Sequence, residues 1–175
     1  ESPAGAVFNW PMMTAAIAEE PACWPAGAVP AYHPVTMGFI AGELIRRIAG
    51  STPGAFLREV MDGAPFASNG EDGNAFDYYI GVPRDALRRC AEISGDFAGT
   101  IFGASDAATL ACRSIRQVRP EMFNSAAFRS AEIPSINGHG APRAIAALFG
   151  HLAQCRAGKR GGLISAAAIK RATQE

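Results

Sequence analysis

Two long stretches of this chain place apolar residues at helical spacing. In the stretch that follows Pro34, charged residues fall on other faces, and the apolar positions recur every three or four residues: Met37, Ile40, Ala41, Leu44 and Ile48. Residues 141–155 keep this spacing with Ile145, Leu148, Phe149 and Leu152. Proline in a first helical turn and glycine just past a last one are typical helix boundaries, so Pro34 and Gly50 should delimit the first helix.

Shorter helices are predicted where a capping residue or a proline precedes an apolar run. The predicted ranges are 10–20 after Asn9, 53–62, 83–90, 105–118, 125–131, and a final helix from Ser165 to about residue 173. Residues 77–82 have the pattern of a strand, whereas 64–74 and 134–140 have loop composition. The predicted fold class is therefore mainly α, with at most one or two short strands.

Composition and charge narrow the class of protein. A chain of 175 residues with 49% hydrophobic side chains can bury a core, so we expect a single domain over residues 1–175. The 16 Lys and Arg residues balance the 16 Asp and Glu residues, which provides no basic surface for nucleic acid. The sequence has no apolar run of about 18 residues, so no membrane span is expected.

The cysteines and glycines suggest neither a metal nor a nucleotide site. Four cysteines lie far apart, with no histidine at zinc-ligand spacing: Cys23, Cys90, Cys112 and Cys155. Apolar helical surroundings favour free thiols, hence a reducing compartment and a cytoplasmic location. The pair Gly161-Gly162 lacks the Lys-Ser/Thr ending of a phosphate loop.

A tyrosine stands between a Pro/Gly turn and the first long helix. The segment reads Pro25-Ala26-Gly27, Tyr32-His33, Gly38, Gly42-Glu43, Arg47 and Gly50. It resembles the second motif region of the serine β-lactamase and penicillin-binding-protein superfamily, in its class C-like, family VIII carboxylesterase branch. A second matching segment reads Phe123-Asn124-Ser125, Glu132-Ile133-Pro134, Asn137-Gly138-His139-Gly140 and Leu148, and ends near residues 163–165.

The resemblance implies the helical subdomain of a β-lactamase/transpeptidase-like fold, as a fragment of a larger two-subdomain hydrolase whose main β-sheet is missing here. It also implies an acyl-enzyme mechanism on a small ester substrate, with no cofactor and with the α/β remainder of the hydrolase as partner. Tyr32 would be the catalytic tyrosine, and His33, Trp24 and Tyr79 are the candidate substrate contacts. Each has a plainer interpretation, since Tyr32 can anchor a turn, His33 can cap a helix, and aromatic rings are often core.

The nucleophile of that mechanism has no counterpart in this sequence. A free tyrosine has a pKa of about 10 and needs a neighbouring positive charge to work at neutral pH. In the resembled family a Ser-x-x-Lys motif supplies that charge. The residues three before Lys159 and Lys170 are Arg156 and Ala167, so the chain alone is predicted to be inactive.

Other interpretations stay open at the level of sequence. The segment His139-Gly140-Ala141 resembles the family's third motif, but its neighbours favour a glycine-bearing loop, and His139 and His151 are weak candidates for substrate contact. The chain could be a non-catalytic helical binding module, or part of a β-lactamase or D-Ala-D-Ala peptidase rather than an esterase. A helical fragment would expose the face that packs on its sheet, so self-association is also predicted.

Overall fold

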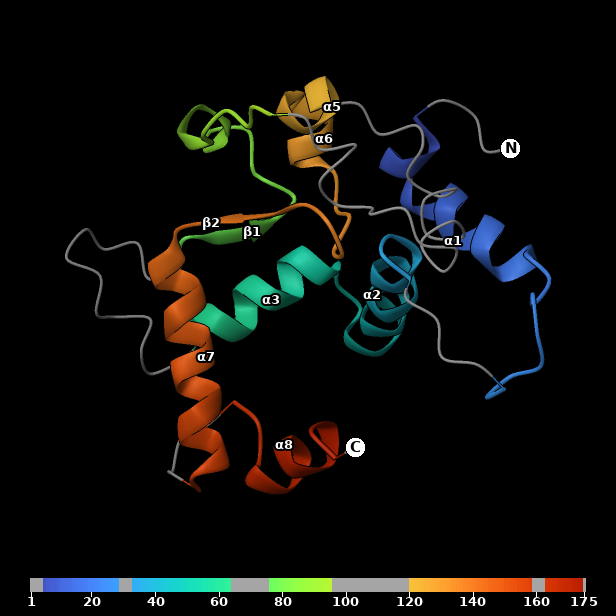
Figure 1. Cartoon of the computed structure of the whole chain (residues 1–175). Helices are drawn as coiled ribbons and strands as arrows, with labels where there is room; N and C mark the ends of the chain where they lie inside the picture. Colours follow the sequence, from blue (N-terminus) through green and yellow to red (C-terminus); the bar gives the residue numbers. More distant parts are fainter. Residues whose placement is uncertain (1–4, 29–32, 64–75, 96–119, 159–162, 175) are drawn as a thin grey trace. The chain divides into compact units, whose positions relative to one another are not determined.

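The computed structural model describes residues 5–28, 33–63, 76–95, 120–158 and 163–174 (Figure 1). The described elements are the 3-10 helices η1 (Ala6–Phe8) and η3 (Leu87–Arg89), the strands β1 (Tyr78–Ile80) and β2 (Gly138–Gly140), and the α-helices α1 (Trp10–Glu19), α2 (Thr36–Ala49), α3 (Pro53–Asp62), α5 (Pro120–Asn124), α6 (Ala126–Ser130), α7 (Pro142–Arg156) and α8 (Ala166–Ala172). The predicted mainly α class is confirmed. The predicted helix 105–118 lies outside the described residues. No described helix has both the length and the apolar character that crossing a membrane requires.

The chain divides into two compact units. The first unit comprises Glu1–Pro53 and Ile80–His139, and the second comprises Gly54–Tyr79 and Gly140–Glu175. Each unit contains one of the two hydrophobic clusters described below. The expectation of one domain over 1–175 stays a prediction.

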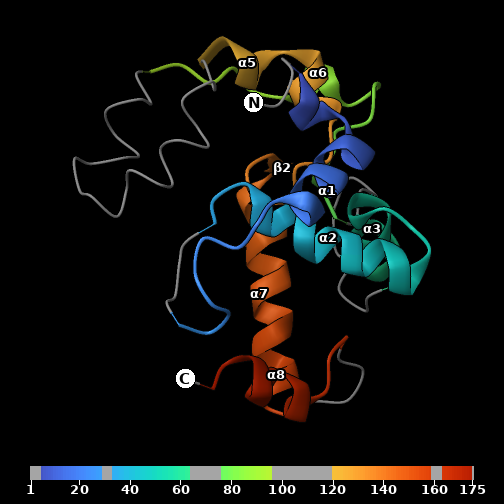
Figure 2. The same ribbon diagram turned by 90° about the vertical axis from the view of Figure 1, so that its right-hand side faces the viewer.

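In the first unit, α1 packs on α2 (Figure 2), and both helices contribute to a hydrophobic cluster whose buried residues are Val35, Phe39, Phe128 and Ile133. The centroids of the Trp10 and Phe39 rings lie 5.0 Å apart. Asn9 caps α1, since its side chain accepts a hydrogen bond from the Met12 amide at 3.1 Å. The predicted start of this helix is confirmed, and its inward residues Trp10, Met13 and Ile17 all pack against the cluster.

Helix α2 turns a face inward that its apolar spacing does not indicate. Its buried residues are Gly38, Phe39 and Gly42, whereas Leu44 is 59% exposed and Ile48 86% exposed. A Cβ atom at Gly38 would lie 2.5 Å from the Ser135 amide nitrogen, so the absence of side chains lets another segment pack tightly there. Close backbone approach therefore decides which face of α2 is buried.

The ends of α2 agree with the prediction only in part. The helix begins at Thr36 rather than at Pro34, because Val35 first turns into the core, where it is buried. The far end is as predicted, since Gly50 adopts a left-handed φ of 71° and its amide donates to the Arg46 carbonyl at 3.0 Å.

A buried asparagine holds the loop that follows α6. Asn137 is 1% exposed, and its Oδ1 accepts from the Ile133 amide at 2.9 Å. Its Nδ2 donates to the Phe128 carbonyl at 3.0 Å and also to the Ala131 carbonyl. One side chain thus satisfies three backbone groups, one at the end of α6 and two in the following loop, and two of these three hydrogen bonds are buried.

Two predicted elements are corrected in or beside the first unit. The helix predicted over 83–90 is only the 3-10 turn η3, because the chain becomes extended at Cys90 and Arg129 Nη2 then binds the Ala91 carbonyl at 2.9 Å. The loop predicted over 134–140 ends in β2, which pairs with β1 in a two-stranded sheet. Glycine has low strand propensity, so composition alone indicated a loop. The strand predicted over 77–82 is confirmed in its centre as β1.

In the second unit, α3 and α7 pack around another cluster, and α8 packs against α7. Met61 is fully buried, and Phe76 and Ala144 are buried beside it. The predicted helices α3 and α7 are confirmed, as is α8, whose Ser165 cap accepts from the Ala168 amide at 3.1 Å. The apolar spacing of α7 marks its inward face only in part. Leu148 packs against the cluster as predicted, but the buried residues are Ala144, His151 and Cys155, and Ile145 and Phe149 are exposed.

Candidate functional site

The predicted site residues do not form one described cluster. Tyr32 lies outside the described residues. His33 is exposed just before α2, and Trp24 is half-buried in the segment after α1. Tyr79 belongs to β1 in the second unit. The roles of these four residues therefore stay predictions.

The ring of Tyr79 already has a close neighbour. The guanidinium carbon of Arg58 lies 4.4 Å from the centroid of the Tyr79 ring, within the range of a cation–π contact. Arg58 Nη2 also donates to the Tyr78 carbonyl at 3.5 Å. A substrate that stacked on this face of Tyr79 would have to displace Arg58.

The two weaker histidine candidates make local hydrogen bonds. His151 is buried in α7, where its Nε2 accepts from the Leu163 amide at 3.1 Å. His139 Nδ1 lies 2.7 Å from the Asn137 carbonyl and carries the proton of that bond, because a carbonyl only accepts. His151 thereby links α7 to the segment that precedes α8.

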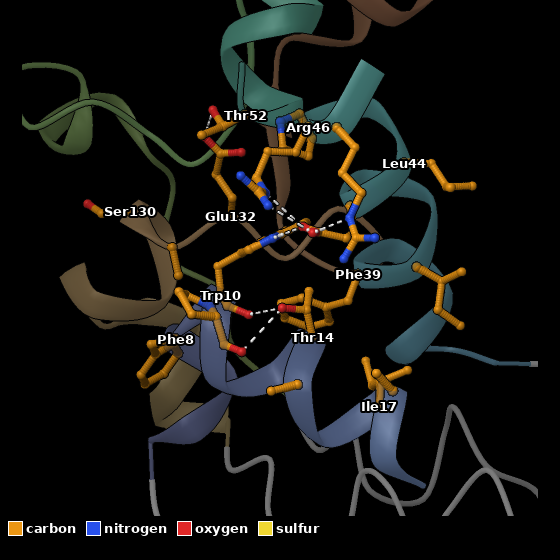
Figure 3. Close-up of a pocket in the computed structure, with 18 residues that line it drawn as sticks. Phe8, Trp10, Thr14, Ile17, Phe39, Leu44, Arg46, Thr52, Ser130 and Glu132 are labelled. Carbon is orange, nitrogen blue, oxygen red and sulfur yellow. Dashed lines mark hydrogen bonds and ion pairs between the residues drawn. The ribbon is translucent and has the colours of Figure 1, made fainter. Parts of the chain in front are cut away.

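A pocket of about 920 Å³ opens between α1 and α2 in the first unit (Figure 3). This volume is within the range of about 300–1,000 Å³ that is usual for small-molecule sites. Its walls are largely apolar and are formed by Phe8, Trp10, Pro11, Ala15, Ile17, Ala18, Phe39, Ile40, Leu44 and Pro53. Its polar lining comprises Thr14, Glu43, Arg46, Arg47, Thr52, Ser130 and Glu132.

The carboxylate of Glu43 is the centre of the polar lining. Its Oε2 accepts from Trp10 Nε1 at 2.9 Å and from Arg46 Nε at 2.8 Å. Its Oε1 accepts from Arg46 Nη2 and from Arg47 Nε, both at 2.9 Å. The hydrogen bonds from Arg46, followed by those from Trp10 and Arg47, hold the pKa of Glu43 well below its usual range. Glu43 is therefore ionised at any ordinary pH.

The sequence offers little that would reveal this pocket. Trp10 and Glu43 are 33 positions apart, and Glu43, Arg46 and Arg47 have the spacing of a solvated helix face. A second polar pair, in which Thr52 Oγ1 donates to Glu132 Oε1 at 2.6 Å, joins residues 80 positions apart. Such contacts arise only from tertiary packing. Among the described residues, no cluster of three or more potential metal ligands is present.

Comparison with known proteins finds similarity among solved structures. The whole chain is similar to a penicillin-binding-protein homologue from Caulobacter crescentus, with a TM-score of 0.80 and 35% identity. The whole chain is also similar to a family VIII carboxylesterase, with a TM-score of 0.79 and 29% identity. In each case it spans 44% of the other chain.

A third solved structure has a lower similarity. It is EstA from Arthrobacter nitroguajacolicus Rue61a, matched over 82% of this chain and 37% of that one, with a TM-score of 0.62. At 23% identity, this likeness indicates a shared fold alone. No family model and no curated protein matches the sequence.

Proposed function

We propose that this chain is the helical subdomain of a carboxylesterase-like serine hydrolase. Its fold is that of one part of a member of the β-lactamase and penicillin-binding-protein superfamily. The predicted resemblance to this superfamily is confirmed. The observation that carries the proposal is the similarity over the whole chain to a structure named as a family VIII carboxylesterase. Because the chain spans less than half of that structure, the activity belongs to a protein that also contains the other part of the fold.

The proposed mechanism is acyl transfer through a serine. A serine hydroxyl, supplied by a Ser-x-x-Lys motif that this sequence lacks, attacks the ester carbonyl and releases the alcohol. Water then hydrolyses the acyl-enzyme and releases the carboxylic acid. Tyr32, with the lysine of that motif, carries the proton from the serine to the leaving alcohol.

The described helices on either side of Tyr32 in the sequence support this role. The turn connects α1, capped by Asn9, with α2, whose N-terminus packs through Val35 and Phe39 into the core of the first unit. In the sequence, Tyr32 therefore comes just before a helix that is anchored in this core. His33, Trp24 and Tyr79 are proposed as substrate contacts in the assembled hydrolase.

A second candidate function is hydrolysis of a β-lactam or a D-Ala-D-Ala peptide, because one similar structure is a penicillin-binding-protein homologue. The gene product should be assayed on a short p-nitrophenyl ester and on a chromogenic cephalosporin side by side. Faster turnover of the ester supports the esterase, and faster turnover of the cephalosporin supports the second candidate. If neither turns over and the gene encodes no Ser-x-x-Lys motif, the chain is a non-catalytic binding module.

A further inference from the structure

The pocket between α1 and α2 combines a largely apolar wall with charged groups. Leu44 and Ile40 line it while remaining 59% and 43% exposed, so each keeps apolar surface that a ligand can cover. Trp10 and Phe39 form the inner part of the wall, and their rings are held by mutual contact at 5.0 Å. Covering such surface with an aliphatic chain is favourable in proportion to the area removed from water.

The charges beside this wall leave donors that Glu43 does not use. Two guanidinium groups share one carboxylate, so the group formed by Glu43, Arg46 and Arg47 carries one net positive charge. Only Nε of Arg47 and Nε and Nη2 of Arg46 are engaged among the described residues. A guanidinium has five N–H donors, and its planar fork matches a carboxylate. Because Glu43 stays ionised, this arrangement persists over the ordinary pH range.

The remaining acid of the lining, Glu132, lies on the side of the pocket opposite Leu44, near Arg46 (Figure 3). Figure 3 shows Glu132 and Thr52 together on one side, with Leu44 and Ile17 on the opposite side. The Thr52 hydroxyl already donates to Glu132 at 2.6 Å. The negative charge of Glu132 is therefore separated from the apolar wall formed by Leu44.

From this juxtaposition we propose that the pocket between α1 and α2 binds an aliphatic monocarboxylate. The carboxylate head is held by the unused N–H groups of Arg47 and Arg46, and the aliphatic chain lies along Leu44, Ile40 and Trp10. This binding site goes beyond the proposed hydrolase function, and it does not depend on Tyr32 or on any catalytic step.

The test is isothermal titration calorimetry of the gene product with decanoate below its critical micelle concentration. Saturable binding at one site per chain is expected. Arg47→Gln removes the main head-group donors, and Leu44→Gln removes apolar wall, so each should weaken binding by about fivefold or more. The matched control is Ile48→Gln, on the same helix but outside the pocket lining, which should bind as the parent does.

Three results would overturn the proposal. The first is the absence of saturable heat, and the second is equal binding of decyltrimethylammonium, which has the same chain with a cationic head. The third is a loss in Ile48→Gln as large as that in Leu44→Gln. Circular dichroism of each variant checks that it is folded. All three substituted side chains are largely exposed, so the fold should tolerate them.

Discussion

Gly42 of α2 should be a position where even the smallest enlargement, the added methyl group of alanine, destabilises the first unit. An added Cβ would lie 2.8 Å from Cγ of Pro53 and closer still to the Trp10 ring. Real Cβ atoms essentially never approach other atoms so closely. The proline ring cannot rotate away, so Gly42→Ala should push Trp10 away from Phe39 and Glu43.

The expected magnitude follows from two opposing effects. Alanine in place of glycine in a helix interior stabilises by about 1 kcal/mol. Overpacking a tight contact costs about 1–3 kcal/mol, and weakening the Trp10–Phe39 ring pair costs about 0.5–1.5 kcal/mol more. Gly42→Ala should therefore lower the free energy of unfolding by about 0.5–3.5 kcal/mol.

A matched control lies in α7. A Cβ at Gly150 would meet no atom within 4 Å. Gly150→Ala should therefore raise the free energy of unfolding by about 0.5–1 kcal/mol, the difference in helix propensity between the two residues. Urea unfolding followed by far-ultraviolet circular dichroism measures both variants. If Gly42→Ala proved as stabilising as Gly150→Ala, the close packing of α1, α2 and Pro53 would be wrong.

Three further predictions concern the same chain. Asn137→Ala leaves three backbone groups, two of them buried, without their side-chain partner, so it should lower the free energy of unfolding by about 2–4 kcal/mol in urea unfolding. A loss below about 1 kcal/mol would show that the loop does not depend on Asn137. The lowered pKa of Glu43 contributes stability that is present above about pH 4.5 and is lost as the pH falls below that value. Glu43→Gln lacks this contribution, so its thermal stability should fall less than that of the parent between about pH 7 and about pH 3. An equal fall in both proteins would contradict this. We also propose that the full chain self-associates through the exposed apolar residues Ile145 and Phe149 of α7. Light scattering should show dimers or larger species that Phe149→Lys reduces, and a clean monomer at high concentration would refute it.

The parts of the fold that the sequence predicts are those with local causes. Asn9, Ser125 and Ser165 each accept a hydrogen bond from an amide three residues later, so the signal and the structure lie within one turn. Gly50 ends α2 for a similarly local reason, its left-handed backbone.

The parts that could not be predicted depend on contacts between distant segments. The inward face of α2 is chosen by Gly38 and Gly42, where other segments approach, and not by its apolar residues. The turn η3 is short because Arg129 binds the following segment. The pocket exists because the Trp10 side chain reaches Glu43, and nothing in the sequence near either residue indicates this contact.

The measurement that tests the central claim most directly is ester hydrolysis by the gene product with Tyr32→Phe, compared with Tyr78→Phe as a tyrosine control in β1. If Tyr32 carries the proton in acyl transfer, Tyr32→Phe should lower kcat/KM by about 10²–10⁴-fold with an unchanged circular dichroism spectrum. Tyr78→Phe should hydrolyse the ester as the parent does. Equal turnover by Tyr32→Phe and the parent would contradict the catalytic role of Tyr32.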